Sequence, residues 1–398
     1  MPTRQAGATL EVLLVCLKLG LTSFGGPVAH IGYYRAEFVV RRRWLDEPAF
    51  ADLVGLCQFL PGPASSQVLF SLGLMRAGYL GGLAAWTAFT LPSAIILVLF
   101  ALGAGVLDGP LGGGLLHGLK LVSVAIVAQA VWGMARTLCP DRQRALIAVV
   151  AALILLFSPS SIAQIATILA GGLAGLALCR TTVATAHGHI GIPISRRTGI
   201  VALAAFFLLL IGLPLLHQGI HPVPGAALFD AFYRSGALVF GGGHVVLPLL
   251  RDAFVTSGWV SDDVFLSGYG AAQAIPGPLF TFAAYLGMVA GPSPHGILGA
   301  AVGLVAIFLP GILILIGTLP FWEMFRTRAS TQAIMQGVNA AVVGLLGAAL
   351  YSPVWTNSVK SPADFGIALI GFILLTVWRA PPLVVVLISA VCGMGVAS

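Results

Sequence analysis

The chain has 398 residues, of which 58% are hydrophobic and only 8% are charged, and its mean hydropathy is +1.01. Soluble domains carry about 25% charged residues, so this composition excludes a soluble globule and indicates a membrane protein. The formal net charge is +7, but the basic residues are scattered among apolar segments, and no nucleic-acid partner is expected.

Several apolar runs are continuous over twenty or so residues, long enough to cross about 30 Å of hydrocarbon as helices. They do not alternate in short stretches as the strands of a membrane barrel do. The sequence therefore predicts an all-α polytopic membrane protein. The five cysteines show no CxxC spacing, so we expect neither a metal site nor a cofactor.

The first predicted elements are short helices interrupted by glycine and proline. Helices are expected over residues 8–24 and Val28–Val40, separated by Gly25-Gly26-Pro27, and over Pro48–Leu60 and Ala64–Met75, separated by Pro61-Gly62-Pro63. Proline removes a backbone donor and glycine frees the backbone, so the helices end there.

Charge bias favours re-entrant hairpins, 8–43 and 48–75, over full crossings for these helices. Full crossings would leave Arg41, Arg42 and Arg43 outside, against the positive-inside tendency. Hairpins keep them in the cytoplasm, together with a retained N-terminus. Four spans complete the first half, which is predicted to begin and end inside: Leu80–Val106, Leu115–Leu138, Ala145–Phe157 and Ile162–Leu178.

Residues 181–199 are predicted to be a polar cytoplasmic linker, and Ile200–Leu216 an extra span without a counterpart in the first half. His187 and His189 in this linker form an HxH pair, which alone is a weak metal motif. Four further spans are expected in the second half: Ile297–Ile316, Gln332–Tyr351, Phe365–Trp378 and Leu383–Gly395.

The broken stretch of the first half occurs again in the second. Phe24-Gly25-Gly26 recurs 216 positions later as Phe240-Gly241-Gly242, and Pro61-Gly62-Pro63 recurs 215 positions later as Pro276-Gly277-Pro278. Because the extra span reverses the chain, the second copy should have the opposite orientation. We expect a first repeat at 1–185, a linker with one inverting span at 186–217 and a second repeat at 218–398.

Inverted repeats with broken helices are typical of secondary transporters, whose sites lie near the membrane midplane. The helices that begin after the four breaks would direct positive dipole ends and unpaired N–H groups inward, which suits an anion. The candidate ligands are Lys18, Gly25, Gly26, Pro27, Gln58, Gly62, Pro63, Ser65, Ser66, Arg234, Gly241, Gly242, Gly243, His244, Gln273, Gly277, Pro278 and Thr281.

Lys18 and Arg234 match between the halves, and we expect them to form a pair of cations across one anion site. A cation in an apolar helix costs about 3 kcal/mol on insertion scales, so it marks a pathway or a partner. The alternative is snorkelling to the interface or pairing with an acid, such as Glu11 with Lys18. His30 and His244 are candidate proton carriers or helix-terminal donors.

The paired FGG…W…Q…PGP pattern closely resembles the long-chain chromate ion transporter (CHR) family. The resemblance covers the whole chain, although Gly243 stands where the first copy has Pro27. It implies a carrier of the bacterial inner (plasma) membrane that exports chromate, a tetrahedral dianion like sulfate. The implied partners are chromate, sulfate and the lipid bilayer, with protons as a candidate coupling ion and a homodimer as a candidate assembly.

Two other classes remain open. A sulfate or other oxyanion importer, or an anion channel, would use the same helix dipoles, and only a carrier would show saturable, alternating exchange. An intramembrane enzyme is disfavoured because HExxH, GxSxG and paired intramembrane acids are missing from the sequence.

Overall fold

The computed structural model describes residues 2–104, 110–158, 160–179, 194–218, 225–240, 243–322, 324 and 328–397. These residues form helices joined by short loops, with no strand among them. Five helical stretches are long and apolar enough to cross a membrane: Ala64–Gly103, Gly112–Leu138, Arg196–Leu216, Gly296–Phe321 and Ala329–Ser358. The prediction of an all-α polytopic membrane protein is confirmed.

The first half begins with short helices, as predicted. Helix α1 covers Pro2–Thr22, α2 covers Gly26–Tyr34 and continues into a π-helical turn, η1, at Arg35–Arg41, and α3 covers Glu47–Phe59. The sequence placed the start of α1 at residue 8, six residues too late. Pro2 can open the helix because its missing N–H would have no partner at the first helical position.

Helix α4, Ala64–Ala104, unites two segments that the sequence predicted separately, Ala64–Met75 and Leu80–Val106. The helix is kinked at Ala77 and Gly78, and Gly78 has a φ of +67°. A Cβ atom on Gly73 would lie 2.3 Å from the Gly81 carbonyl oxygen, so the chain folds back on itself at this point, and the break expected between Met75 and Leu80 is confirmed. The first half ends with α5, Pro110–Leu138, α6, Arg142–Phe157, and α7, Ser161–Leu178.

Helix α8, Arg196–Gln218, corresponds to the extra span, whereas His187 and His189 of the linker lie outside the described residues. The remaining helices of the second half are α9 (Ala226–Ala237), η2 (Gly243–Val245), α10 (Val246–Arg251), η3 (Asp252–Thr256), α11 (Asp262–Ala274), η4 (Leu279–Thr281), α12 (Phe282–Val289), α13 (Gly296–Thr318), η5 (Leu319–Phe321), α15 (Ala329–Ala349), η6 (Leu350–Trp355), α16 (Thr356–Ser358), α17 (Pro362–Thr376) and α18 (Pro382–Ala397). Their order follows that of the first half, with α12 and α13 in the place of α4.

Close helix contacts recur in both halves. A Cβ atom on Gly20 of α1 would lie 2.7 Å from the Phe89 carbonyl oxygen of α4, and one on Gly236 of α9 would lie 2.2 Å from the Ile307 carbonyl oxygen of α13. Gly20 and Gly236 are 216 positions apart. Small residues let helix backbones approach in lipid. The two halves therefore share both their helix order and this packing.

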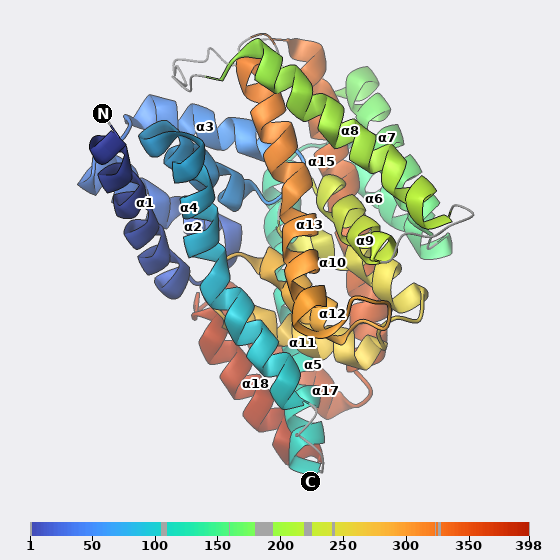
Figure 1. Cartoon of the computed structure of the whole chain (residues 1–398). Helices are drawn as coiled ribbons and strands as arrows, with labels where there is room; N and C mark the ends of the chain where they lie inside the picture. Colours follow the sequence, from blue (N-terminus) through green and yellow to red (C-terminus); the bar gives the residue numbers. More distant parts are fainter. Residues whose placement is uncertain are drawn as a thin grey trace.

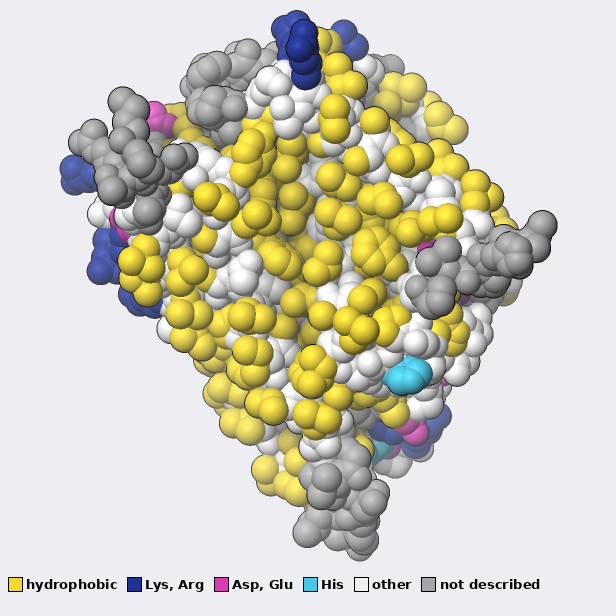
Figure 2. Space-filling view, in the orientation of Figure 1, with side chains coloured by type: hydrophobic (Ala, Val, Ile, Leu, Met, Phe, Trp, Pro, Cys, Tyr) yellow, Lys and Arg dark blue, Asp and Glu magenta, His cyan; other side chains and the backbone are white. Residues whose placement is uncertain are grey.

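In Figure 1 the corresponding long helices run in opposite directions, since α4 descends beyond its kink to the bottom of the view and α13 rises toward the top. Hydrophobic side chains cover the middle of the face in Figure 2, and most Lys and Arg side chains lie near its margins. An apolar belt between charged margins is what a lipid environment requires. The orientation of the halves relative to the cytoplasm stays a prediction.

We expect Gly287→Ala to destabilise the protein by about 1–3 kcal/mol, because overpacking at a close contact forces the helices apart. A Cβ atom at Gly287 would lie 2.2 Å from the Gly299 carbonyl oxygen of α13. Gly133→Ala is the matched control, since a Cβ atom there meets nothing within 4 Å. Thermal unfolding in one detergent compares the two variants, and equal midpoints would contradict the close contact.

Candidate functional site

Two backbone hydrogen bonds join the breaks of the two halves. The N–H of Gly62 donates to the Val239 carbonyl oxygen at 2.7 Å, and the N–H of Gly277 donates to the Ser23 carbonyl oxygen at 2.9 Å. Gly62 and Gly277 are equivalent in the repeat, as are Ser23 and Val239. In each bond the PGP glycine of one half donates to the residue before the FGG break of the other half. Each PGP loop therefore lies against the FGG break of the opposite half.

Glycine is required in these loops. The φ angles of Gly25, Gly62 and Gly277 are +95°, +116° and +106°, a region that side chains disfavour. There is also no room for a side chain at two of these positions. A Cβ atom on Gly62 would lie 2.8 Å from the Gly311 Cα, and one on Gly277 would lie 2.8 Å from the Ser93 Oγ. The loops therefore press against the middle of α13 and α4.

His30 lies at the contact between α2, α4 and the first break. Its side chain is fully buried, with Nε2 3.2 Å from the Ser23 carbonyl oxygen and Nδ1 3.4 Å from the Ser65 Oγ. The Ser23 oxygen also accepts the bond from Gly277. One carbonyl thus connects the first break, the start of α4 through His30, and the second PGP loop.

His244 occupies a comparable position in the second half. Its Nδ1 lies 2.9 Å from the Tyr269 hydroxyl of α11, and its Nε2 lies 3.9 Å from the place that a Cβ atom on Gly26 would take. The imidazole of one half therefore faces the glycine break of the other. Both predicted histidines lie where the FGG breaks and the PGP loops of the two halves meet, which we call the cluster of breaks. They are not equivalent in the repeat.

The first helical turn of α4 supplies the polar side chains of the cluster. Ser65, Ser66 and Gln67 are all buried, and Gln67 Nε2 donates to the Pro61 carbonyl oxygen at 3.0 Å and to the Gly311 carbonyl oxygen at 2.9 Å. In the second half Thr281 is buried, and its hydroxyl donates to the Pro278 carbonyl oxygen at 2.7 Å.

Several buried polar atoms near the breaks have no hydrogen-bond partner among the described residues. An unpaired buried donor or acceptor costs about 1–3 kcal/mol, so a group of them suits a bound ligand. These atoms are Ser23 Oγ, Ser66 Oγ, Gln67 Oε1, Thr90 Oγ1 and Gln273 Nε2.

Sequence reasoning missed Ser23, Thr90, Ser93 and Tyr269. Thr90 and Ser93 flank Pro92 within α4, and both side chains are buried. A proline with neighbouring hydroxyls inside a long apolar run is the signal that could have identified them, because interrupted helices line sites in transporters.

The two predicted cations lie in different surroundings. Arg234, on the last turn of α9, pairs with the buried Asp230 through Nε at 2.9 Å. Lys18 is exposed on a stripe of α1 that also carries the exposed Leu14 and Leu21. The described residues provide Lys18 with no ion pair. Glu11, its candidate partner, pairs instead with Arg42 and Arg76.

The two predicted glutamines also differ. Gln58 is exposed, whereas Gln273 is half-buried. Gly243 opens η2 and is buried, but Gly241 and Gly242, as well as the side chain of Pro27, lie outside the described residues. The structure thus brings the PGP loops, Ser65, Ser66, Thr281 and His244 to the breaks, and leaves Lys18 and Gln58 on the outside.

Equivalent ion pairs join the ends of the short helices in both halves. Arg35 pairs with Glu47, and Arg251 pairs with Asp262 at 2.9 Å. Among the described residues no group of three His, Cys, Asp or Glu side chains could hold a metal ion.

Comparison with known proteins gives a consistent family. The chain matches the chromate transporter family over residues 10–176 and 226–394. It is 31% identical to the chromate transport protein of Pseudomonas aeruginosa over 94% of this chain and 88% of that protein. It is also 29% identical to the probable chromate transport protein of Synechococcus elongatus, over 95% and 93% of the two chains.

A third relative, the chromate transport protein of Cupriavidus metallidurans, is 26% identical over 85% of this chain and 81% of its own length. No solved structure matches the chain. The two regions matched by the family contain both sets of breaks, and the chain belongs to the chromate transporter family.

Proposed function

We propose that this protein is a secondary transporter that exports chromate from the cytoplasm, with the anion bound near the membrane midplane between the helix N-termini of the two repeats. The family and the named activity of its relatives support the substrate. The observation that carries the mechanism is the reciprocal pair of hydrogen bonds, Gly62 to Val239 and Gly277 to Ser23, which gathers the breaks into one place.

The cluster of breaks has the chemistry of an anion site. Helices α2 and α4 begin at Gly26 and Ala64, and helical turns begin at Gly243 and Leu279 in the second half. The unpaired N–H groups at such starts carry a positive partial charge. The hydroxyl groups of Ser65 and Ser66 add donors without bringing a negative charge. Gln58, Gln273, Thr281 and His244 stay predicted ligands.

The proposed location is the bacterial inner membrane, with the N-terminus in the cytoplasm. The cations of Arg41 to Arg43 and of Arg196 and Arg197 would then lie on the cytoplasmic side. In this arrangement the repeats at 1–185 and 218–398 have opposite orientations, joined by the inverting span within 186–217.

The second candidate is a sulfate or other oxyanion importer, or a channel for such anions. Backbone N–H groups and hydroxyls recognise the shape and charge of a tetrahedral dianion, and sulfate shares both with chromate. The buried unpaired hydroxyls of Ser66 and Thr90 would serve either anion equally.

Flux into inside-out membrane vesicles tests the proposal. We expect saturable chromate uptake that speeds up when the vesicles are preloaded with chromate, since a carrier exchanges bound anions. Parallel measurements with sulfate, and with and without an imposed proton gradient, give the substrate preference and the coupling ion. Uptake only into right-side-out vesicles would indicate an importer, and flux that does not saturate would indicate a channel.

Arg234→Ala should lower chromate affinity about 10-fold to 100-fold, the value of a hydrogen bond to a charged group. The substitution also removes the ion pair that Arg234 makes with the buried Asp230, which can destabilise the fold. Asp230→Asn combined with Arg234→Ala removes that acid. Chromate affinity should fall by a similar factor in the double variant, and an immunoblot of membranes should show normal amounts of protein.

The controls separate a ligand from a structural pair. Wild-type transport in the double variant would mean that Arg234 only neutralises Asp230. Lys18→Ala is the comparison, because an outward-facing side chain should affect transport less than Arg234.

Thr90→Val should weaken chromate binding about 10-fold while leaving stability unchanged or slightly higher. The threonine hydroxyl has no partner among the described residues, so valine of similar shape removes only a group that the anion would engage. Ser123→Ala is the control, since the Ser123 hydroxyl is buried but already donates to Leu119 and Leu266. Uptake kinetics and thermal unfolding are measured on both variants, and unchanged affinity in Thr90→Val would remove Thr90 from the site.

A further inference from the structure

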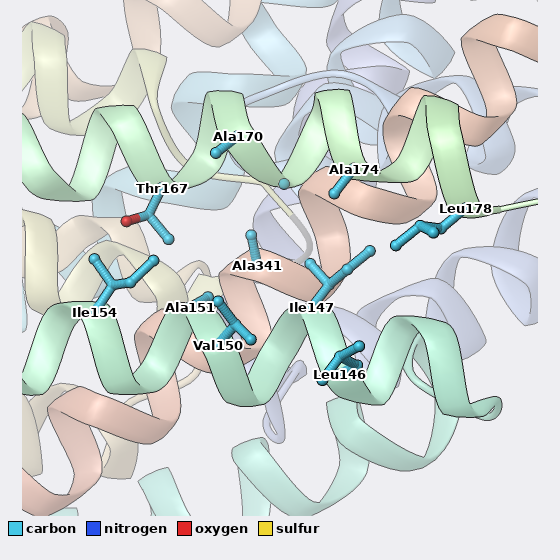
Figure 3. A pocket seen from close by; sticks show the side chains of 11 residues that line it. Leu146, Ile147, Val150, Ala151, Ile154, Thr167, Ala170, Ala174, Leu178 and Ala341 are labelled. Carbon is cyan, nitrogen blue, oxygen red and sulfur yellow. The ribbon is translucent and has the colours of Figure 1, made fainter.

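A groove runs between α6 and α7, away from the helix breaks. Figure 3 shows its lining side chains in two rows, one from each helix, with Ala341 of α15 between them. The volume of the groove is about 210 Å³. Of the eleven described residues that line it, only Thr167 has a polar side chain. The groove is therefore shaped for an extended apolar chain.

The rim of the groove is open to the surroundings of the protein. Leu146, Val150 and Ile154 of α6 are 58%, 45% and 43% exposed, and Leu178 of α7 is 41% exposed. Three of these residues follow one another at four-residue spacing, so they form a straight stripe along α6. An occupant would lie parallel to the helix and across the apolar belt.

A cation lies at one end of this stripe. Arg142 comes one helical turn before Leu146, and its side chain is exposed. The neighbouring Asp141 is already occupied, since it accepts the Arg144 backbone N–H at 2.9 Å and the Arg144 guanidinium at 2.6 Å. Among the described residues Arg142 has no ion pair, so its charge is available to an anionic group at the mouth of the groove.

The described residues of the second half differ at the corresponding position. The position equivalent to Arg142, 219 residues later, is Ser361, whose hydroxyl caps α17 by accepting from the Asp364 N–H. The neighbouring cation, Lys360, donates to the Thr356 carbonyl oxygen, so it differs from Arg142, whose charge has no partner among the described residues.

We propose that the groove between α6 and α7 binds one acyl chain of an anionic phospholipid, whose headgroup lies against Arg142. The apolar lining matches the acyl chain, the stripe sets its direction, and Arg142 selects the negative headgroup. Attraction of an anionic lipid surface to one Arg corresponds to about a fivefold change in binding. The site is separate from the proposed chromate site.

Native mass spectrometry of the full-length protein in neutral detergent tests the proposal. The probes are dioleoyl phosphatidylglycerol, which is anionic, and dioleoyl phosphatidylcholine, which is zwitterionic. We expect the wild type to retain one phosphatidylglycerol and much less phosphatidylcholine. Arg142→Glu should lower phosphatidylglycerol retention about fivefold or more, and Ala174→Phe, which fills the groove, should also lower it.

Matched controls accompany each variant. Arg197→Glu makes the same charge change at an exposed site on α8, and Ala177→Phe adds the same ring to an exposed position of α7 that does not line the groove. Both should retain lipid as the wild type does. Equal retention in all four variants, or equal retention of the two lipids, would overturn the proposal. Loss of a dimer in Ala174→Phe without loss of lipid would instead assign the groove to a second copy of the chain.

Discussion

The hydrogen bonds from Gly62 to Val239 and from Gly277 to Ser23 are the contact on which the centre of this protein depends. A helix that breaks inside hydrocarbon exposes N–H and carbonyl groups that lipid cannot satisfy. Here each half satisfies groups at the break of the other half. The two halves are thus held together at their helix breaks. Glycines supply the φ angles that the loops at these breaks need.

The two halves share a backbone arrangement, but their side chains differ at equivalent positions. At the start of the helix after each PGP loop, the first half has Ser65, Ser66 and Gln67, and the second half has Phe280, Thr281 and Phe282. Phe280 and Phe308 stand at the positions that correspond in the repeat to Ser65 and Thr90. Their ring centroids lie 5.8 Å apart. Polar donors therefore gather on one side of a symmetric scaffold. Such an asymmetry suits a site that must hold an anion and also exclude water.

Charged residues of the first half also connect helices. Glu11 of α1 pairs with Arg42 at 2.7 Å and with Arg76 of α4 at 2.8 Å, and both arginines lie near the ring of Trp44. The sequence predicted only that Arg42 lies on the cytoplasmic side. In the structure Arg42 and Arg76 also link α1, η1 and α4 at their ends. Arg142, by contrast, has no ion pair among the described residues.

The amino-acid sequence determined the class of protein, the helical fold, the positions of the breaks and the duplication. These properties depend on hydropathy and on Gly and Pro, which act over a few neighbouring residues and are therefore readable along the chain. The tertiary structure decided which groups meet: His30 with Ser23 and Ser65, Thr90 and Ser93 beside the breaks, and Lys18 on the outer side of α1. Those contacts join segments far apart in sequence, and they depend on how each helix is rotated about its axis, which the local pattern does not specify.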